Sequence, residues 1–185
     1  MALTTLDPKT ALILIDLQKG IVGMQTAHPS ADVVRNARAL ADAFRARGLP
    51  VVLVNVSGAA PGRAEQSRSM ANRPPDWTEL VPELNQQPSD ITVTKRSWGA
   101  FTTTDLDARL RKLGVTQVVI GGIATTAGVE STARSAHELG YNVTLAVDAM
   151  TDMNADAHTN SVTRIFPRLG ETGTTAAIIA MLNAA

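Results

Sequence analysis

One charged residue stands where a predicted buried strand ends, and its carboxylate could move protons in a small molecule. A continuous apolar run covers residues 10–15 and is followed directly by Asp16. Lys95 follows another predicted strand at residues 91–94. Ligands of open α/β sheets bind along the carboxyl ends of the strands, so the Asp16 carboxylate is placed where it could exchange a proton with a ligand. Taken alone, Asp16 could instead be a helix cap or a surface carboxylate, and Lys95 a surface lysine.

A glycine-containing stretch after another buried run could bind an anion. Residues 118–120 are apolar, and Gly121 and Gly122 close the run. A helix is predicted to follow, with Thr125 or Thr126 as its cap and Gly140 at its end. Its apolar stripe is predicted to consist of Val129, Ala133, Ala136 and Leu139. The N–H groups of its first turn would present partial positive charge to a developing oxyanion or to a carboxylate. The alternative is a strand–helix crossover whose glycines serve only packing.

This stretch resembles the isochorismatase-like hydrolases, also called the cysteine hydrolase family, whose pattern is roughly G-V-A-T-D-x-C-V-x-x-T-A-x-x-A-x-x-x-G-Y. The matching residues are Gly122-Ile123-Ala124-Thr125-Thr126-Ala127-Gly128-Val129, Thr132-Ala133, Ala136 and Gly140-Tyr141. Lys95 matches as well, because the family carries a lysine followed by a short motif that here ends in Gly99-Ala100-Phe101. The resemblance covers nearly the whole chain.

The resemblance implies a set of site residues. Asp16 and Lys95 would be catalytic, and Gly128 stands where most members carry the nucleophilic cysteine. A cis peptide bond is implied between Ile123 and Ala124. The residues that would bind substrate are Gln18, Trp98, Phe101, Ile123, Ala124 and Thr125.

The glycine at position 128 decides which reactions the site could catalyse. Most members hydrolyse amides with an Asp-Lys-Cys set, and this chain contains no cysteine. True isochorismatases also lack the cysteine, commonly with glycine there, and cleave a vinyl ether without a covalent intermediate. The first hypothesis is therefore a noncovalent hydrolase of a small carboxylate or carbonyl compound, in which Asp16 acts as acid or base and Lys95 as electrostatic partner. The second is a catalytically silent binding or assembly protein that kept the fold.

A catalytic metal and a cofactor are not expected. Metal-dependent relatives place an Asp-x-His pair after the second strand, where this chain has Asn55-Val56-Ser57. The three histidines, His28, His137 and His158, are not spaced as a metal cluster. We expect His137 and His158 to be surface or interface residues.

The elements that must position these residues alternate between strand and helix. A helix is predicted over residues 30–47 and a strand over 51–56, and later strands and helices continue the alternation. This order predicts an α/β fold, a three-layer α/β/α sandwich with about six parallel strands, and the resemblance implies the Rossmann-like order 3-2-1-4-5-6. We expect residues 1–185 to form a single isochorismatase-like hydrolase domain.

The amino-acid composition limits the classes of binding partner to be expected. The chain has 185 residues with 44% hydrophobic and 18% charged residues, and 17 basic residues balance 17 acidic ones. This balance argues against a nucleic-acid or membrane partner and leaves a small-molecule substrate. The N-terminal stretch lacks a basic region and a long apolar segment, which favours the cytoplasm. Helices lined by Ala and Leu, together with the family resemblance, predict a homodimer or larger homo-oligomer.

Overall fold

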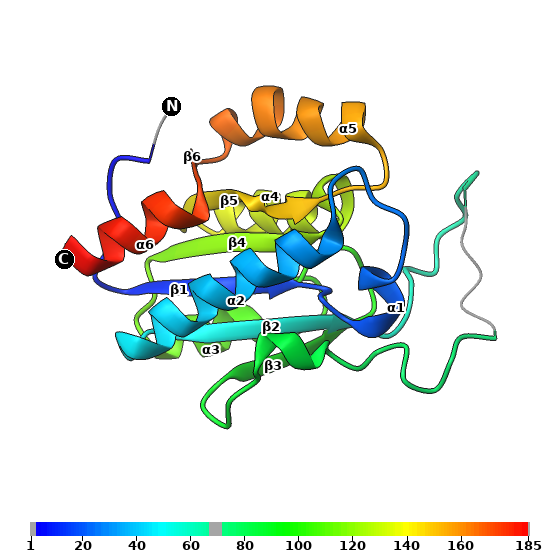
Figure 1. Ribbon diagram of the computed structural model, residues 1–185, viewed down its shortest axis with the longest axis horizontal. Helices are drawn as coiled ribbons and strands as arrows, with labels where there is room; N and C mark the ends of the chain where they lie inside the picture. The colour runs from blue at the N-terminus through cyan, green and yellow to red at the C-terminus, as the bar shows by residue number, and fades with distance from the viewer. Residues whose placement is uncertain (1–2, 67–71, 185) are drawn as a thin grey trace.

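The computed structural model describes residues 3–66 and 72–184 and shows a parallel sheet between two layers of helices (Figure 1). The sheet has six strands in the order β3-β2-β1-β4-β5-β6. This confirms the predicted α/β sandwich and the predicted strand order. The strands are β1 (Thr10–Ile15), β2 (Val51–Val56), β3 (Ile91–Lys95), β4 (Gln117–Ile123), β5 (Asn142–Thr151) and β6 (Glu171–Gly173).

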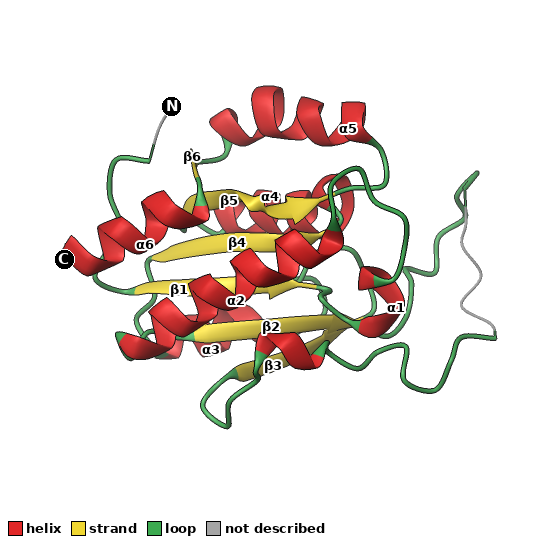
Figure 2. Ribbon diagram, in the orientation of Figure 1, coloured by secondary structure: helices red, strands yellow, loops and turns green. Residues whose placement is uncertain are grey.

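Helices cover both faces of the sheet (Figure 2). The α-helices are α1 (Lys19–Val22), α2 (Ser30–Ala46), α3 (Leu106–Lys112), α4 (Glu130–Glu138), α5 (Ala155–Asn160) and α6 (Thr175–Ala184). In the view of Figure 1, α2 and α6 lie in front of the sheet and α3 and α4 lie behind it. The structure also has short 3-10 or π-helical segments at η1 (Pro82–Leu84), η2 (Thr125–Val129), η3 (Ser161–Ile165) and η4 (Phe166–Arg168).

The apolar pattern of the sequence explains this layering. All six residues of β1 and all seven of β4 are buried, as expected for inner parallel strands covered on both sides. Alternate residues of β1 enter opposite cores: Ile13 packs into the cluster under α3 and α4, and Leu12 packs into the cluster under α2 and α6. The face of α2 that meets the sheet carries apolar residues at helical spacing, namely Val33, Val34, Ala37, Leu40, Ala41 and Phe44.

Strands β1 and β4 lie side by side and end together. Ile15 pairs with Gly122 in their parallel register. Gly122 has φ +125°, and a Cβ there would lie 2.1 Å from the carbonyl oxygen of Ile15, so only glycine allows this close approach. The chain order reverses between these two strands, and that switch point is where ligands bind in open α/β sheets. Asp16 and the segment that follows Ile123 therefore emerge at the same place.

Two details of the helices differ from the predictions. The helix expected to begin at a Thr125 or Thr126 cap begins with the π-helical turn η2 and becomes α-helical only at Glu130. Leu139, predicted to lie in the apolar stripe of this helix, is 40% exposed, because α4 ends at Glu138 and Leu139 lies beyond its packed face. Within the described ranges, the structure contains no helix long and apolar enough to span a membrane.

Candidate active site

Asp16 and Lys95 form a buried ion pair at the carboxyl edge of the sheet. Lys95 Nζ lies 2.7 Å from Asp16 Oδ2 and 3.2 Å from the carbonyl oxygen of Ser97. Asp16 is 6% exposed and Lys95 is 2% exposed. Lys95 is the last residue of β3, and its long side chain extends past the end of β2 to reach the residue after β1. The structure thus brings together Asp16, which was predicted from its place at a strand end, and Lys95, which the family resemblance implied.

The environment of Asp16 favours its protonated form. Burial raises the pKa of the Asp16 carboxyl to about 6, while the charge and hydrogen bond of Lys95 act in the opposite direction. Asp16 Oδ1 is buried and has no hydrogen-bond partner. A buried polar atom without a partner is uncommon in proteins and is frequent at sites that bind or transform a ligand. Asp16 also adopts φ +53°, a left-handed conformation that is unusual for a residue other than glycine.

Gly128 faces this ion pair. An ideal Cβ built on Gly128 would lie 3.2 Å from Asp16 Oδ2 and 3.5 Å from Lys95 Nζ. The same Cβ would lie 2.7 Å from Cγ2 of Ile15, which is fully buried. A side chain at position 128 would therefore point at both charged groups, and none is present.

The segment between Ile123 and Gly128 is held from β5. The peptide bond between Ile123 and Ala124 is cis, as the resemblance implied. Asp152, which directly follows β5, accepts hydrogen bonds at Oδ2 from the backbone N–H of Thr126 at 2.8 Å and from its hydroxyl at 2.7 Å. The cap of this turn is therefore the carboxylate of Asp152, and the prediction of a threonine cap was wrong.

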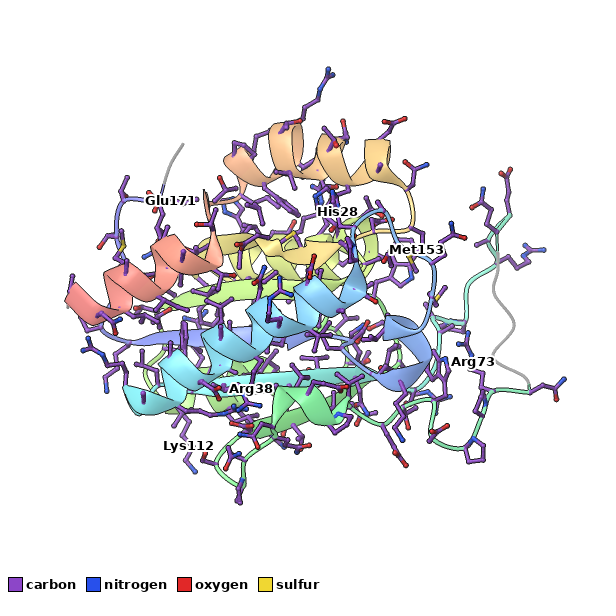
Figure 3. The ribbon with its side chains drawn as sticks, in the orientation of Figure 1. His28, Arg38, Arg73, Lys112, Met153 and Glu171 are labelled. Atoms are coloured by element: carbon purple, nitrogen blue, oxygen red, sulfur yellow. The ribbon has the colours of Figure 1, made fainter. Side chains whose placement is uncertain are left out.

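His158 also belongs to this region, and the expectation of a surface or interface residue was wrong for it. His158 is 9% exposed, and its Nδ1 lies 2.8 Å from the hydroxyl oxygen of Thr125, which is fully buried. Burial lowers the pKa of His158, the nearby His28 lowers it further, and Asp152 opposes both. The His28 ring lies edge-on to the His158 ring at 4.8 Å between centroids. Figure 3 labels His28 on the loop before α2, beneath α5.

Glu130 adds another contact between α4 and the segment after α5. Its Oε2 accepts a hydrogen bond from the Ser161 hydroxyl at 2.6 Å. Asp152 directly follows β5, but the apolar run of that strand is interrupted at Asp148, so the rule that singled out Asp16 points to Asp148 and not to Asp152. The sequence carries no comparable signal for His158 and Ser161, whose partners lie 33 and 31 residues earlier in the chain.

Gln18, predicted to bind substrate, joins three segments of the protein. Its Nε2 donates to the carbonyl oxygens of Val56 at 3.1 Å and Trp77 at 3.0 Å, and its Oε1 accepts from the N–H of Val56. Gln18 is fully buried, and these contacts use both of its N–H donors. It therefore fixes the end of β2 and the loop at Trp77 relative to β1.

The two aromatic residues predicted to bind substrate, Trp98 and Phe101, lie in different surroundings. Trp98 follows Lys95 by three residues and is 66% exposed. Phe101 stacks on Tyr141 at 5.8 Å between ring centroids. Tyr141 directly precedes β5, and Phe101 also packs against the core cluster that contains Val129 and Ala133.

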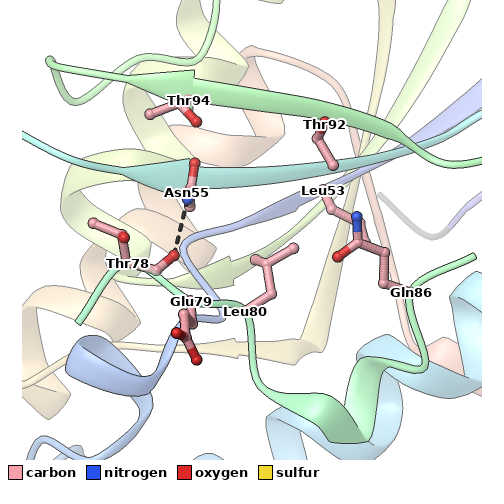
Figure 4. A pocket seen from close by; sticks show the side chains of 8 residues that line it. All are labelled: Leu53, Asn55, Thr78, Glu79, Leu80, Gln86, Thr92 and Thr94. Atoms are coloured by element: carbon pink, nitrogen blue, oxygen red, sulfur yellow. Dashed lines mark hydrogen bonds between the residues drawn. The ribbon is translucent and has the colours of Figure 1, made fainter. Parts of the chain in front are cut away.

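Two surface hollows lie away from the ion pair. One, of about 410 Å³, is bordered by β2, β3 and residues 78–86, and its polar lining includes Asn55, Thr92 and Thr94 (Figure 4). The other, also about 410 Å³, lies between α1, α2 and the segment around Val81. Neither contains Asp16, Lys95 or Gly128. Over residues 3–66 and 72–184, no group of three or more His, Cys, Asp or Glu side chains is placed to hold a metal ion.

Comparisons with known proteins agree with this geometry. A family model described as the isochorismatase domain matches residues 10–177. The isochorismatase family protein YwoC of Bacillus subtilis is 46% identical, over 90% of this chain and 90% of its own length. A solved isochorismatase family protein from Burkholderia thailandensis superposes with a TM-score of 0.93 at 46% identity and covers 97% of this chain and 98% of that one. Ureidoacrylate amidohydrolase RutB of Pantoea ananatis is 32% identical over 76% of this chain and 68% of its own.

Proposed function

The chain belongs to the isochorismatase family, and from this premise we propose that it is a hydrolase that acts without a covalent intermediate. Its substrate class is a small carboxylated or carbonyl compound, and an isochorismate-type vinyl ether is the leading candidate. Asp16 supplies and recovers the proton, and Lys95 stabilises negative charge on the substrate. Gly128 has no side chain, so position 128 supplies no nucleophile beside the ion pair.

One observation carries this proposal. A Cβ at position 128 would lie 3.2 Å from Asp16 Oδ2 and 3.5 Å from Lys95 Nζ. Gly128 has no side chain, and the whole sequence has no cysteine. The arrangement that would activate a thiol is therefore present without the thiol. A carboxyl group with a pKa of about 6 and a free oxygen is suited to proton transfer near neutral pH.

Vinyl-ether cleavage can proceed with the Asp16 carboxyl group, the Lys95 ammonium and water. Protonated Asp16 gives its proton to the terminal vinyl carbon, and the carbon–carbon double bond becomes an oxocarbenium ion. Water adds to that cation and returns a proton to the Asp16 carboxylate. The resulting hemiketal breaks its carbon–oxygen bond to give a ketone and an alcohol, so one water is consumed. The low-dielectric surroundings of the pair strengthen the effect of the Lys95 charge on a substrate carboxylate.

Amide hydrolysis is the competing reaction within the same family. RutB is an amidohydrolase by name, and the resemblance links amide hydrolysis to a cysteine at position 128. A neutral hydroxyl replaces a thiol only when a base activates it. His158 lies next to the Thr125 hydroxyl, but that hydroxyl is fully buried. We therefore rank vinyl ethers above amides and esters.

A substrate screen with matched variants tests the proposal. Vinyl ethers, carboxamides and esters of small carboxylic acids are incubated with the wild-type protein, with Asp16→Asn and with Lys95→Met. We expect turnover of a vinyl ether that both variants reduce strongly while circular dichroism stays native. Turnover that survives in Asp16→Asn would refute the assignment to this site. No turnover of any compound, with tight binding of one of them, would favour the silent binding protein.

A further inference from the structure

Thr132 connects the helix that follows Gly128 to the loop that follows Lys95. It is fully buried in α4. Its hydroxyl donates to the carbonyl oxygen of Gly128 at 2.6 Å and accepts from the backbone N–H of Ala100 at 3.0 Å. The first contact is an ordinary bond of a helical threonine to the carbonyl four residues earlier. The second joins two segments that are 32 residues apart in the chain.

Ala100 is held on both sides of its peptide backbone. Its carbonyl oxygen accepts from the hydroxyl of Thr104 at 2.6 Å, and its N–H is bound by Thr132. The loop around it lies against α4, since a Cβ on Gly99 would be in van der Waals contact with the carbonyl oxygen of Ser131 at 3.5 Å. Ala100 itself is fully buried. The loop thus has a fixed position relative to the first turn of α4.

The same loop holds the ammonium of Lys95. The carbonyl oxygen of Ser97 accepts from Lys95 Nζ at 3.2 Å, and the Ser97 hydroxyl donates to the carbonyl oxygen of Gly99 at 3.2 Å. A continuous set of contacts therefore runs from Gly128 through Thr132 and the loop to Lys95. The Lys95 ammonium in turn donates a hydrogen bond to Asp16 Oδ2.

We propose that Thr132 is a positioning residue: by fixing the loop that follows Lys95 to the helix that carries Gly128, it keeps the Lys95 ammonium on Asp16. Thr132 touches neither Asp16 nor Lys95 and acts only through the loop. Its importance for turnover rests on the proposed function. Its effect on the ion pair does not, because the ion pair can be observed in the protein without any substrate.

Two substitutions separate the hydroxyl of Thr132 from its shape. Thr132→Val keeps the branched side chain and removes the hydroxyl, whereas Thr132→Ser keeps the hydroxyl. In Thr132→Val the Ala100 amide loses its acceptor, and we expect its hydrogen exchange to accelerate by about 10-fold or more. Thr163→Val is the matched control. It also removes a helical threonine bond to the carbonyl four residues earlier, that of Thr159, in the separate segment η3.

The decisive measurement is the pKa of Asp16, followed by carbon-13 NMR of its carboxyl group in the free protein, with Asp16→Asn used for assignment. Lys95 is the charged group that lowers this pKa. If the ammonium loses its position in Thr132→Val, the Asp16 pKa rises by about one pH unit. Thr132→Ser and Thr163→Val are expected to leave it at the wild-type value.

Each outcome decides the proposal. Faster exchange at Ala100 in Thr132→Val with an unchanged Asp16 pKa would show that Thr132 only stabilises the fold, and would overturn the proposal. If Thr132→Val does not fold, Thr104→Val loosens the same loop from the other side of Ala100 and must raise the Asp16 pKa, and an unchanged value would again overturn it. A raised pKa in a protein that turns over no substrate would uphold Thr132 as a positioning residue and count only against the proposed function.

Discussion

Lys95 Nζ and Asp16 Oδ2 lie 2.7 Å apart, although the strands that precede them are separated by β2. The contact is possible because both residues stand at carboxyl ends of parallel strands and the lysine side chain spans the intervening strand. Removing two charges from water is costly, and a buried ion pair often returns no net stability. The pair is therefore better explained by a use of its charges than by a contribution to folding.

Replacing Asp16 with Asn should remove turnover and leave the fold intact. The amide keeps the shape of the carboxyl group but cannot give and recover a proton, so we expect turnover to fall by about 100-fold or more. The fold should stay native by circular dichroism, but the melting temperature should fall, because the buried Lys95 ammonium loses its carboxylate partner. Steady-state kinetics and thermal unfolding measure both. Near-wild-type turnover on a verified substrate would contradict the assignment.

The pH profile should show that Asp16 acts as the acid. The pKa of Asp16 is about 6, and only the protonated carboxyl can give a proton, so kcat/KM on a vinyl ether should fall as pH rises through 6. Lys95→Met removes the charge that lowers this pKa, so the falling limb should move to higher pH. A rate that instead rises through pH 6 would mean that Asp16 acts as a base.

The sequence predicts much of this site because the rule involved is local. Asp16 follows a buried strand, and parallel strands bring such positions to one edge of the sheet, whereas Lys95 was singled out by the family resemblance. Gly128 and the strand order came from the family resemblance, and the structure agrees with the order. The prediction for Asp16 needed only its position at the end of its own strand.

The residues that were missed depend on contacts between distant segments. His158 is buried because η2 places Thr125 against α5, and no pattern within residues 155–165 shows this partner. Gln18 was predicted to bind substrate on the basis of the family resemblance. The structure assigns its amide to Val56 and Trp77, a contact that depends on the course of the loop after β2.

Wild-type stability should fall relative to Asp16→Asn as pH rises. The folded-state pKa of Asp16 is about 6 and its ordinary value is 3.8, so between these values the folded protein binds more protons than the unfolded chain. Stability from this group is fully present below 3.8 and is lost as pH rises through 6. The free energy of unfolding of the wild type minus that of Asp16→Asn should decrease by about 2 kcal/mol from about pH 4 to pH 7. Urea titrations at several pH values measure it, and a difference that stays constant would contradict the raised pKa.

The protein should be a dimer or larger assembly in solution. Leu113 and Leu139 are 47% and 40% exposed at the ends of α3 and α4, and Trp98 is more exposed still. Large apolar side chains at the surface favour association with a second copy. Light scattering at micromolar concentration should give at least twice the chain mass of 19.5 kDa. A mass of one chain at this concentration would contradict the prediction.

Adding a single methyl group at position 128 should disturb the ion pair and the core together. The Cβ of Gly128→Ala would meet Ile15 Cγ2 at 2.7 Å and Asp16 Oδ2 at 3.2 Å. The methyl group of Ile15 is attached directly to its own Cβ and the residue is fully buried, so it can yield only through a different Ile15 rotamer or a shift of the end of β1. Overpacking of this kind costs about 1–3 kcal/mol.

The matched control for this substitution is Gly62→Ala, because a Cβ on Gly62 has no heavy atom within 4 Å. We expect the control to stay within about 0.5 kcal/mol of the wild type, and Gly128→Ala to lose stability and to change the pKa of Asp16 as well. Chemical unfolding and the carbon-13 titration of Asp16 report the two effects separately. Equal stability of the two variants would mean that the space in front of Gly128 is open. A lower stability of Gly128→Ala with an unchanged Asp16 pKa would mean that position 128 does not face the carboxyl group.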